Sequence, residues 1–327
     1  MNKILLTGHK GFLGSYLFKF LKKNKKNKII GADINLYSNK RKYEENFINI
    51  KSKNLKNLDT IIHLAGISTN YDPRENIYKQ LSYKSNLYDT LLLAKKAKKA
   101  GIKKFIFASS TSVYGDKKNS IVNEKSSLAP TTSYGKSKAL IEKKLKKMAN
   151  GNFQVIILRM VTLFGESKRM RFDLLVNNLV CSYLTKKKII LLSDGKKIRP
   201  QIHLKDVVKV YEYFIENEIK QNCLILNVGR EELNLRVAQI AKKISNALKC
   251  KIEYGKADID KRSYKVSFKR LGKFISFKKN INTIEMTSKK IAKLYRAKKQ
   301  NYFKNKSFYN LSSVKFLIKN KEIKKLI

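Results

Sequence analysis

Residues 7–14 read Thr-Gly-His-Lys-Gly-Phe-Leu-Gly, with glycines at positions 8, 11 and 14. This segment follows a short apolar run at residues 3–6 and opens an amphipathic stretch at 12–23. Glycines in such a place let the backbone turn sharply and approach a pyrophosphate, which then meets the positive end of the helix. The next apolar run, residues 28–32, ends at Asp33, where an acid accepts hydrogen bonds from ribose hydroxyls. The stretch therefore predicts a dinucleotide-binding turn between a strand and a helix.

Strand-like and helix-like stretches alternate along the first half of the chain. Apolar runs of strand length are each followed by a stretch with helical periodicity. We expect strands at residues 3–6, 28–32, 60–64, 104–108 and 154–158, and helices at 12–23, 81–100 and 132–148. Because parallel strands need such crossover helices, the sequence predicts an α/β fold with a Rossmann-type doubly wound parallel sheet.

After Gly165 the alternation becomes looser. We expect helices at residues 172–184, 205–217 and 235–248, and short strands at 189–192 and 224–228. We therefore expect two domains. Residues 1–165 form a Rossmann domain that binds the dinucleotide. Residues 166–327 form a smaller C-terminal α/β portion that binds the substrate and carries a basic tail.

Lysine dominates the charge of the chain. The 73 Lys and Arg residues exceed the 24 Asp and Glu residues by 49, and 11 of the 73 are arginines, which leaves 62 lysines. Proteins that bind phosphate groups are usually enriched in Arg, because the guanidinium grips phosphate through two hydrogen bonds. The composition therefore indicates that lysine is enriched over the whole surface. Nucleic-acid or anionic-membrane binding is the weaker alternative, and we expect no specific nucleic-acid partner.

Cysteine and histidine usage limits the class of protein further. Cys181, Cys223 and Cys250 lie far apart, and neither His63 nor His203 has a second ligand at metal-binding spacing, so we expect no metal. We expect His203 to be structural. Sparse cysteines fit a reducing compartment. No stretch of the sequence resembles a signal peptide, and none approaches an apolar window of about 18 residues. These features predict a cytoplasmic protein.

The last stretch of the chain is basic and mildly amphipathic. Residues 286–327 contain 13 basic residues and one acid, Glu322, and apolar residues alternate loosely with the lysines. We expect a terminal helix docked on its own core. The alternative is a weak association of the basic C-terminus with an anionic surface.

The choice of cofactor depends on two residues. A carboxylate at Asp33 repels a 2′-phosphate and so favours NAD over NADP. Lys10, just before the second glycine, is the opposing signal, because a cation there could meet a 2′-phosphate. In so lysine-rich a chain one lysine is a weak argument, so the sequence predicts NAD, with NADP as the alternative.

Further motifs follow in order along the first ~165 residues. Residues 63–66 read His-Leu-Ala-Gly, residues 109–115 read Ser-Ser-Thr-Ser-Val-Tyr-Gly, and residues 134–138 read Tyr-Gly-Lys-Ser-Lys. With the glycine-rich stretch, Asp33, Asn86 and Arg159, they resemble the extended short-chain dehydrogenase/reductases, specifically the NAD-dependent sugar-nucleotide epimerase/dehydratase family. Beyond that point the resemblance lies mainly in residues 199–207.

Three residues are the predicted catalytic group. Tyr134 and Lys138 stand four residues apart at the start of a predicted helix, so they share one face. Ser110 ends a predicted strand at the carboxyl edge of the sheet, where ligands bind in such folds. Tyrosine has a reference pKa of about 10, and the charge of Lys138 favours the phenolate. The resemblance implies that Tyr134 removes a proton from a sugar hydroxyl as hydride moves to NAD, and that Ser110 hydrogen-bonds the same oxygen.

The residues after Ser110 distinguish between possible reactions. By the resemblance, relatives that eliminate water carry an Asp-Glu pair where this chain has Thr111 and Ser112, and hydroxyl groups cannot replace those acids. The sequence therefore favours an NAD-dependent epimerase (an isomerase of polysaccharide biosynthesis) that acts on a nucleotide-diphosphate sugar through a transient 4-keto intermediate. The alternatives are an NAD(P)-dependent reductase or dehydratase on the same fold, or a non-catalytic dinucleotide-binding protein.

The resemblance also implies which residues surround the two ligands. Arg199 stands where the family places a diphosphate-binding Arg, although Pro200 replaces the usual Asp, and Arg171 and Arg262 lie in two further basic stretches. The predicted substrate-binding residues are Thr111, Arg171, Arg199 and Arg262. The predicted cofactor-binding residues are Gly8, Lys10, Gly11, Phe12, Leu13, Gly14, Asp33, Leu64, Ala65, Gly66, Asn86, Ser109, Tyr134 and Lys138. A homodimer through the helices at 81–100 and 132–148 is a further expectation from the family.

Overall fold

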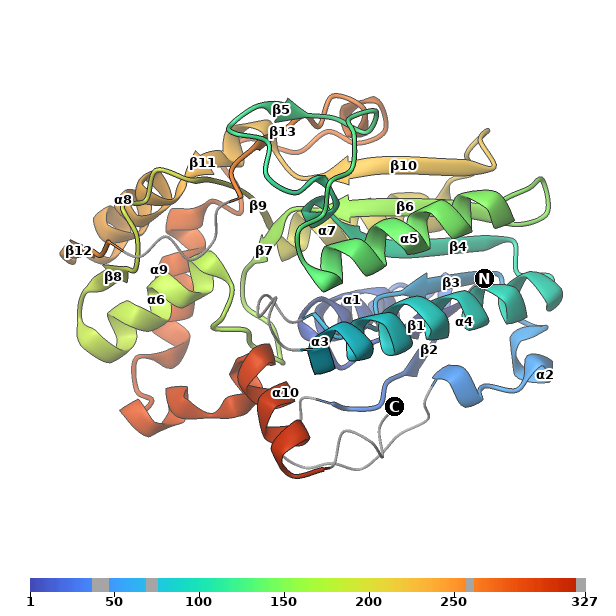
Figure 1. Cartoon of the computed structure of the whole chain (residues 1–327), viewed down its shortest axis with the longest axis horizontal. Coiled ribbons are helices and arrows are strands. Elements are labelled where there is room, and N and C mark those ends of the chain that lie inside the picture. The colour runs from blue at the N-terminus through green and yellow to red at the C-terminus, as the bar shows by residue number, and fades with distance from the viewer. Residues whose placement is uncertain (37–46, 69–75, 257–261, 322–327) are drawn as a thin grey trace.

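The centre of the molecule is a sheet of six parallel strands. The computed structural model describes residues 1–36, 47–68, 76–256 and 262–321. The strands follow the order β10-β6-β4-β3-β1-β2 (Figure 1). They are β1 (Asn2–Thr7), β2 (Asn27–Ala32), β3 (Thr60–His63), β4 (Lys104–Ser110), β6 (Gln154–Met160) and β10 (Cys223–Val228). β3, β4 and β6 are buried along almost their whole length, which explains their unbroken apolar runs. The predicted Rossmann-type sheet is confirmed.

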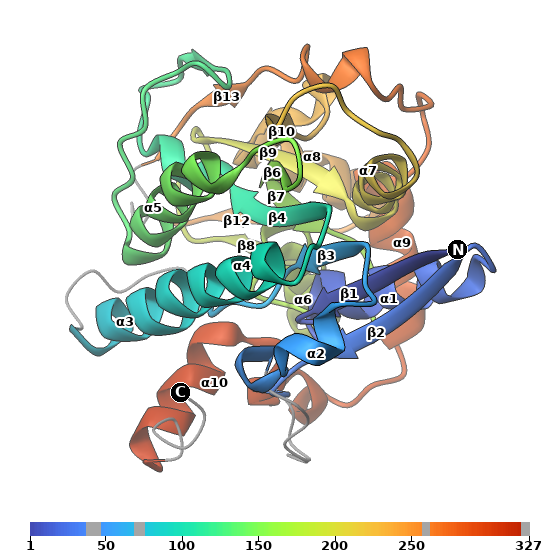
Figure 2. The ribbon, with the colours of Figure 1, turned by 90° about the vertical axis from the view of Figure 1, so that its right-hand side faces the viewer.

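Helices cover both faces of this sheet. Figure 2 shows α4 (Asp89–Lys99) and α5 (Ser133–Met148) on one side, and α1 (Phe12–Lys23) and α7 (Leu204–Glu216) on the other. A short helix, α2 (Ser52–Leu55), precedes β3. The prediction of one regular helix at residues 81–100 is wrong in one respect. The helical region begins earlier and consists of α3 (Asn76–Leu81), a π-helical turn at Ser82–Tyr88, and α4.

The second half of the chain is not separate from the large sheet. Its strand β10 pairs with β6 in parallel, so the chain returns to the sheet after residue 165. Three smaller sheets accompany the large one. The first contains β7 (Thr162–Phe164), β9 (Ile198–His203) and β11 (Asn234–Arg236). The second pairs β8 (Ile189–Leu191) with β12 (Ile252–Tyr254), and the third pairs β5 (Ile121–Val122) with β13 (Lys265–Val266). The helices of the second half are α6 (Leu175–Lys186), α7, α8 (Val237–Leu248), α9 (Ile284–Tyr295) and α10 (Asn310–Lys319). Both halves of the chain thus contribute strands to the large sheet.

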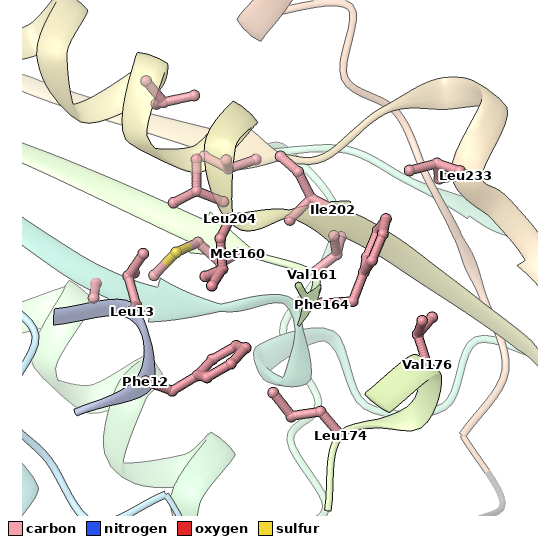
Figure 3. Close-up of a cluster of buried hydrophobic side chains, with 14 of the residues drawn as sticks. Phe12, Leu13, Met160, Val161, Phe164, Leu174, Val176, Ile202, Leu204 and Leu233 are labelled. Atoms are coloured by element: carbon pink, nitrogen blue, oxygen red, sulfur yellow. The ribbon is translucent and has the colours of Figure 1, made fainter. Parts of the chain in front are cut away.

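An apolar cluster joins the two halves beneath the carboxyl ends of the strands. Figure 3 shows Phe12 and Leu13, from the start of α1, facing Met160 at the end of β6. Phe164 and Ile202, from the paired strands β7 and β9, complete the contact. All five side chains are less than a tenth exposed, so the two halves share one core. The cleft between them therefore has a closely packed apolar floor.

The basic C-terminal segment contains a helix that packs on the protein itself. Val314 and Leu317 of α10 are buried against Leu36, Ile67 and Leu81. This agrees with the expected docked helix. In the part of the chain that the structure describes, no helix combines the length and apolarity needed to cross a bilayer.

Candidate active site

The glycine-rich loop fits tightly between two strand ends and the first helix. Gly8 donates from its backbone N–H to the Ala32 carbonyl over 2.8 Å and has φ +73°, and its place for a Cβ lies 2.7 Å from the Ala65 nitrogen. A Cβ on Gly14 would lie 1.9 Å from the Gly8 carbonyl oxygen. Side chains are therefore excluded at both positions, and the N-terminus of α1 opens directly on the loop. Such a cradle fits the pyrophosphate of a dinucleotide.

Asp33 holds this loop in place. Its Oδ2 accepts a hydrogen bond from the Lys10 backbone N–H over 2.8 Å, and its Oδ1 accepts one from the Asn35 N–H over 2.7 Å. Each carboxylate oxygen has a second lone pair, so both can still accept from ribose hydroxyls. Asp33, predicted to accept hydrogen bonds from the ribose of the cofactor, thus also stabilises the glycine-rich turn.

The loop after β3 forms the second wall. His63 is fully buried between Thr7 and Thr90, whose hydroxyls lie 2.7 and 2.8 Å from its ring nitrogens. Burial lowers its pKa to about 3, so the imidazole is neutral. Asn86, from the π-helical turn, accepts from the Ile67 N–H over 2.7 Å and donates to the Ile67 carbonyl over 3.0 Å. Asn86 therefore fixes the loop at Gly66 through the neighbouring residue Ile67.

One cavity of about 580 Å³ lies at the carboxyl ends of the strands, between the two halves of the chain. It gathers most of the predicted site residues: Gly8, Gly11, Phe12, Leu13, Gly14, Leu64, Gly66, Ser109, Ser110, Thr111, Tyr134, Lys138, Arg171, Arg199 and Arg262. Lys10, Asp33, Ala65 and Asn86 are not among the described residues that line it. The structure thus brings the predicted catalytic, cofactor and substrate residues to one place, with these four supporting the loops around it.

The three predicted catalytic residues come from two elements. Ser110 ends β4, and its Oγ accepts from the Ser112 N–H over 3.2 Å. Thr132 caps α5 by accepting from the Gly135 N–H over 3.1 Å, so Tyr134 and Lys138 lie in the first turns of the helix. The short side chain of Thr132 suits this place because it satisfies a backbone donor that the helix leaves open.

Lys138 is buried beneath the cavity. Its Nζ donates to the Ala108 carbonyl over 2.8 Å and lies 4.4 Å from the centre of the Phe107 ring and 5.6 Å from that of Tyr134. Burial lowers the pKa of Lys138 to about 7, and the negative charge of Glu142 opposes that shift. A cation in this position favours ionisation of the neighbouring phenol.

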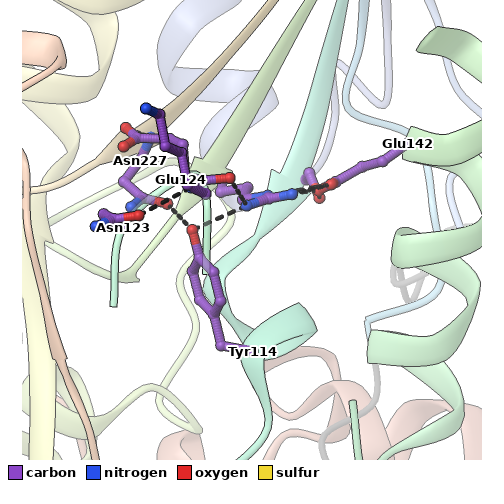
Figure 4. Close-up of polar contacts among 8 residues, drawn as sticks. Tyr114, Asn123, Glu124, Glu142 and Asn227 are labelled. Carbon is purple, nitrogen blue, oxygen red and sulfur yellow. Dashed lines mark hydrogen bonds and ion pairs between the residues drawn. The ribbon is translucent and has the colours of Figure 1, made fainter. Parts of the chain in front are cut away.

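A buried polar network lies behind these residues and ties α5 to the sheet (Figure 4). Glu142, one turn after Lys138, accepts a hydrogen bond from the Ser109 hydroxyl and pairs with Arg159 of β6 at 2.7 Å. Arg159 also donates to the Tyr114 hydroxyl over 2.9 Å, and that hydroxyl donates to Asn227 Oδ1 over 2.7 Å. The Glu142 carboxylate and the Arg159 guanidinium are each less than 5% exposed. The network therefore fixes the helix that carries Tyr134 and Lys138 against β4 and β6.

The second half of the chain, residues 166–327, is called the substrate half after its predicted role, and it contributes cations to the cavity. Among the described residues that line it, this half supplies Arg169, Arg171, Lys197, Arg199 and Arg262, and Asp173 is the one acid; the sixth cation, Lys138, comes from α5. Arg171 is held by two hydrogen bonds to Asp173, of 2.9 and 2.8 Å. Arg199 donates to the Arg262 carbonyl and to the Ile198 carbonyl, which joins β9 to the loop at Arg262. Asp260 and Lys261, just before Arg262, lie outside the described residues.

Several lining residues escaped the reasoning from sequence. Arg169, Lys197, Tyr264 and Asn310 all border the cavity. Tyr264 donates from its hydroxyl to the Thr111 carbonyl over 3.0 Å and so holds the backbone next to Ser110. Basic runs surround Arg169 and Lys197 in the sequence, but no motif singles out Tyr264 or Asn310. His203, by contrast, is structural as expected, because its Nδ1 caps α7 by accepting from the Lys205 N–H.

Comparison with known proteins agrees with this geometry. A family model described as "NAD dependent epimerase/dehydratase family" matches residues 4–229. The chain belongs to this family. The resemblance found from the motifs is thereby confirmed, and NAD, the predicted cofactor, is the cofactor of the family.

Two curated family members illustrate the range of reactions. The uncharacterized UDP-glucose epimerase YtcB of Bacillus subtilis is 32% identical over 227 residues, which cover 63% of this chain and 70% of that protein. The dTDP-D-glucose 4,6-dehydratase of Dictyostelium discoideum is 31% identical over 281 residues, which cover 75% of this chain and 62% of that one. This chain thus spans about two thirds of the length of these relatives, and they include both an epimerase and a dehydratase.

A solved structure shares the fold. It is the UDP-glucuronic acid 4-epimerase from Bacillus cereus, in complex with UDP-glucuronic acid and NAD. It has a TM-score of 0.75 and 23% sequence identity, and the match covers 90% of this chain and all of that one. At this identity the likeness concerns the fold alone.

Proposed function

We propose that this chain is an NAD-dependent epimerase of a nucleotide-diphosphate sugar that works through a transient 4-keto sugar. The observation that carries the proposal is the meeting of Ser110, Tyr134 and Lys138 in one cavity with the glycine-rich loop. The cations of the substrate half support a ligand with two phosphates, because guanidinium groups bind phosphate oxygens strongly.

In the proposed chemistry the three side chains act both when the sugar carbon is oxidised and when it is reduced again. Tyr134, as phenolate, takes the proton of the sugar hydroxyl, and Ser110 donates a hydrogen bond to the same oxygen while it becomes a ketone. Lys138 in its protonated form lowers the cost of the phenolate, because its Nζ lies 5.6 Å from the centre of the Tyr134 ring. When bound, NAD accepts the hydride and returns it. Tyr134 gives the proton back after the ketone has presented its other face, which inverts the carbon.

The neighbours of Ser110 favour epimerisation over loss of water. Thr111 and Ser112 are the next two residues, and both are buried hydroxyls beside the cavity. Thr111 is engaged by Tyr264, whose hydroxyl lies 3.3 Å from its Oγ1. Elimination of water from a sugar needs a general acid and a general base, and these two hydroxyls supply neither near neutral pH.

The test combines the cofactor, the product and one variant. We expect the purified protein to release stoichiometric NAD on denaturation, measured by mass spectrometry, because an epimerase regenerates its cofactor in every turnover. We expect NMR of UDP-sugar mixtures to show inversion at C4 without loss of water, and Tyr134→Phe to abolish it while NAD is retained. A dehydrated product would overturn the epimerase proposal in favour of a dehydratase. Unchanged turnover in Tyr134→Phe would overturn the role of Tyr134.

We also propose that the chain forms a homodimer through α4 and α5. Tyr88 is 64% exposed, Leu92 41% and Leu140 37%, and they lie at these two helices, which pack against each other. Exposed apolar side chains on adjacent helices are typical of a helical interface. Light scattering after gel filtration tests this: we expect twice the chain mass for the protein and a shift to monomer for Leu92→Glu.

A further inference from the structure

The C-terminal helix α10 lies on the loops that surround the cofactor site. It is found at the bottom of both views, apart from α9 (Figures 1 and 2). Its buried residues Val314 and Leu317 pack on Leu36, which follows β2, and on Ile67, which follows β3. These are the carboxyl ends of strands, where a sheet of this kind binds its ligand. The helix therefore covers two of the loops that hold the dinucleotide.

Asn310, the first residue of α10, connects both walls of the cleft. Its Nδ2 donates to the Ser68 carbonyl over 2.8 Å, on the cofactor side. Its Oδ1 accepts from Arg169 Nη2 over 2.5 Å, and its backbone N–H donates to Asp173 Oδ2 over 3.2 Å, both on the substrate side. The side chain is 3% exposed and lines the cavity itself.

We propose that Asn310 is a positioning residue that, together with α10, fastens the cleft around bound NAD. Through Ser68 it fixes the loop after β3, and through Arg169 and Asp173 it fixes the cations of the substrate half. NAD leaves after these contacts have opened, so α10 keeps the cofactor on the protein between turnovers. This inference rests on the proposed function, because it requires the cavity to hold NAD.

Three variants of the full chain test this proposal. Asn310→Ala removes the link across the cleft, and Val314→Asp places a charge on the buried face of α10. Ser312→Asp places the same charge on an exposed position of the same helix and serves as the control. The readout is the release of isotopically labelled NAD from loaded protein into an excess of unlabelled NAD, with thermal unfolding of each variant measured in parallel.

We expect Asn310→Ala to release NAD about tenfold faster, because one hydrogen bond to a charged group corresponds to about that factor. Val314→Asp should also release NAD faster, because a charge on the buried face weakens the packing of α10 on the loops. Ser312→Asp should stay within about twofold of the unmodified protein. If Asn310→Ala releases NAD at the unmodified rate, the proposal is overturned. It is likewise overturned if both variants lose thermal stability with no change in release, since that marks a purely structural helix.

Limited trypsin digestion gives a second readout that needs no variant. Lys315 and Lys319 are exposed on α10, and cleavage requires the helix to detach locally. We expect NAD to slow cleavage at both sites, and equal rates with and without NAD contradict the proposal. Unmodified protein that retains no labelled NAD would instead contradict the proposed function. Retained NAD with unchanged variants contradicts the role of Asn310 and α10 alone.

Discussion

The substitution Glu142→Leu tests whether the buried ion pair behind the site stabilises the fold. The Glu142 carboxylate accepts three hydrogen bonds from Arg159, of 3.1, 3.1 and 2.7 Å, and one from Ser109. Its removal leaves a guanidinium that is 4% exposed without its counter-charge. Breaking such a pair costs about 3–5 kcal/mol, and the remaining contacts of Arg159 with Tyr114 and Glu124 place the expected loss near the lower end.

The assay is urea unfolding followed by circular dichroism on cofactor-free protein, because bound NAD would stabilise the native state by mass action. Glu253→Leu is the matched control, since its pair with Lys188 is also 2.7 Å long but its side chain is 53% exposed. We expect that control to cost less than about 1 kcal/mol. The double variant Glu142→Leu/Arg159→Met should be more stable than Glu142→Leu, because it removes the unpaired charge. Equal losses for Glu142→Leu and Glu253→Leu would refute the reasoning, since solvent would then screen both pairs alike.

Three further predictions concern the cofactor loop, the buried lysine and the substrate cations. Gly14→Ala should abolish NAD retention, because its Cβ would meet the Gly8 carbonyl oxygen at 1.9 Å, whereas Gly151→Ala, with open space around it, should retain NAD by mass spectrometry. Lys138 titrates at about 7 in the folded protein and at about 10.4 when unfolded, so the unfolded chain binds more protons between these values and stability rises with pH there. Lys138→Met should remove that part of the rise in urea unfolding, and an unchanged slope would contradict the shift. Arg199→Ala should raise KM for the nucleotide sugar by about tenfold with little change in kcat, and a loss confined to kcat would argue against diphosphate binding.

The local patterns of the sequence were sufficient for the parallel sheet and the predicted catalytic group. The glycine spacing at residues 7–14 indicates a tight turn between a strand and a helix, and in the structure two of the three glycines have no room for a Cβ. The pair Tyr134 and Lys138 depends on helical periodicity, and Ser110 depends on the end of a strand. Each is a short-range property that a few neighbouring residues decide.

Contacts between distant segments could not be predicted in this way. Glu142 and Arg159 are 17 residues apart and Asn310 and Ser68 are 242 apart, and no periodicity or motif relates either pair. The π-helical turn at Ser82–Tyr88 was also missed, since the apolar periodicity of residues 81–100 fits one regular helix; in the structure Asn86 of this turn bonds the loop at Ile67.

Residue patterns alone thus predicted the class of fold, a dinucleotide-binding turn and the three residues proposed for catalysis. The tertiary structure decided which cations face the cavity, that β10 returns to the large sheet, and that the basic C-terminal helix lies over the cofactor loops. The physical reason is that propensity and spacing act within a few residues of chain. The meeting of remote segments depends on how apolar faces such as those of Val314 and Ile67 are jointly buried, which no single segment specifies.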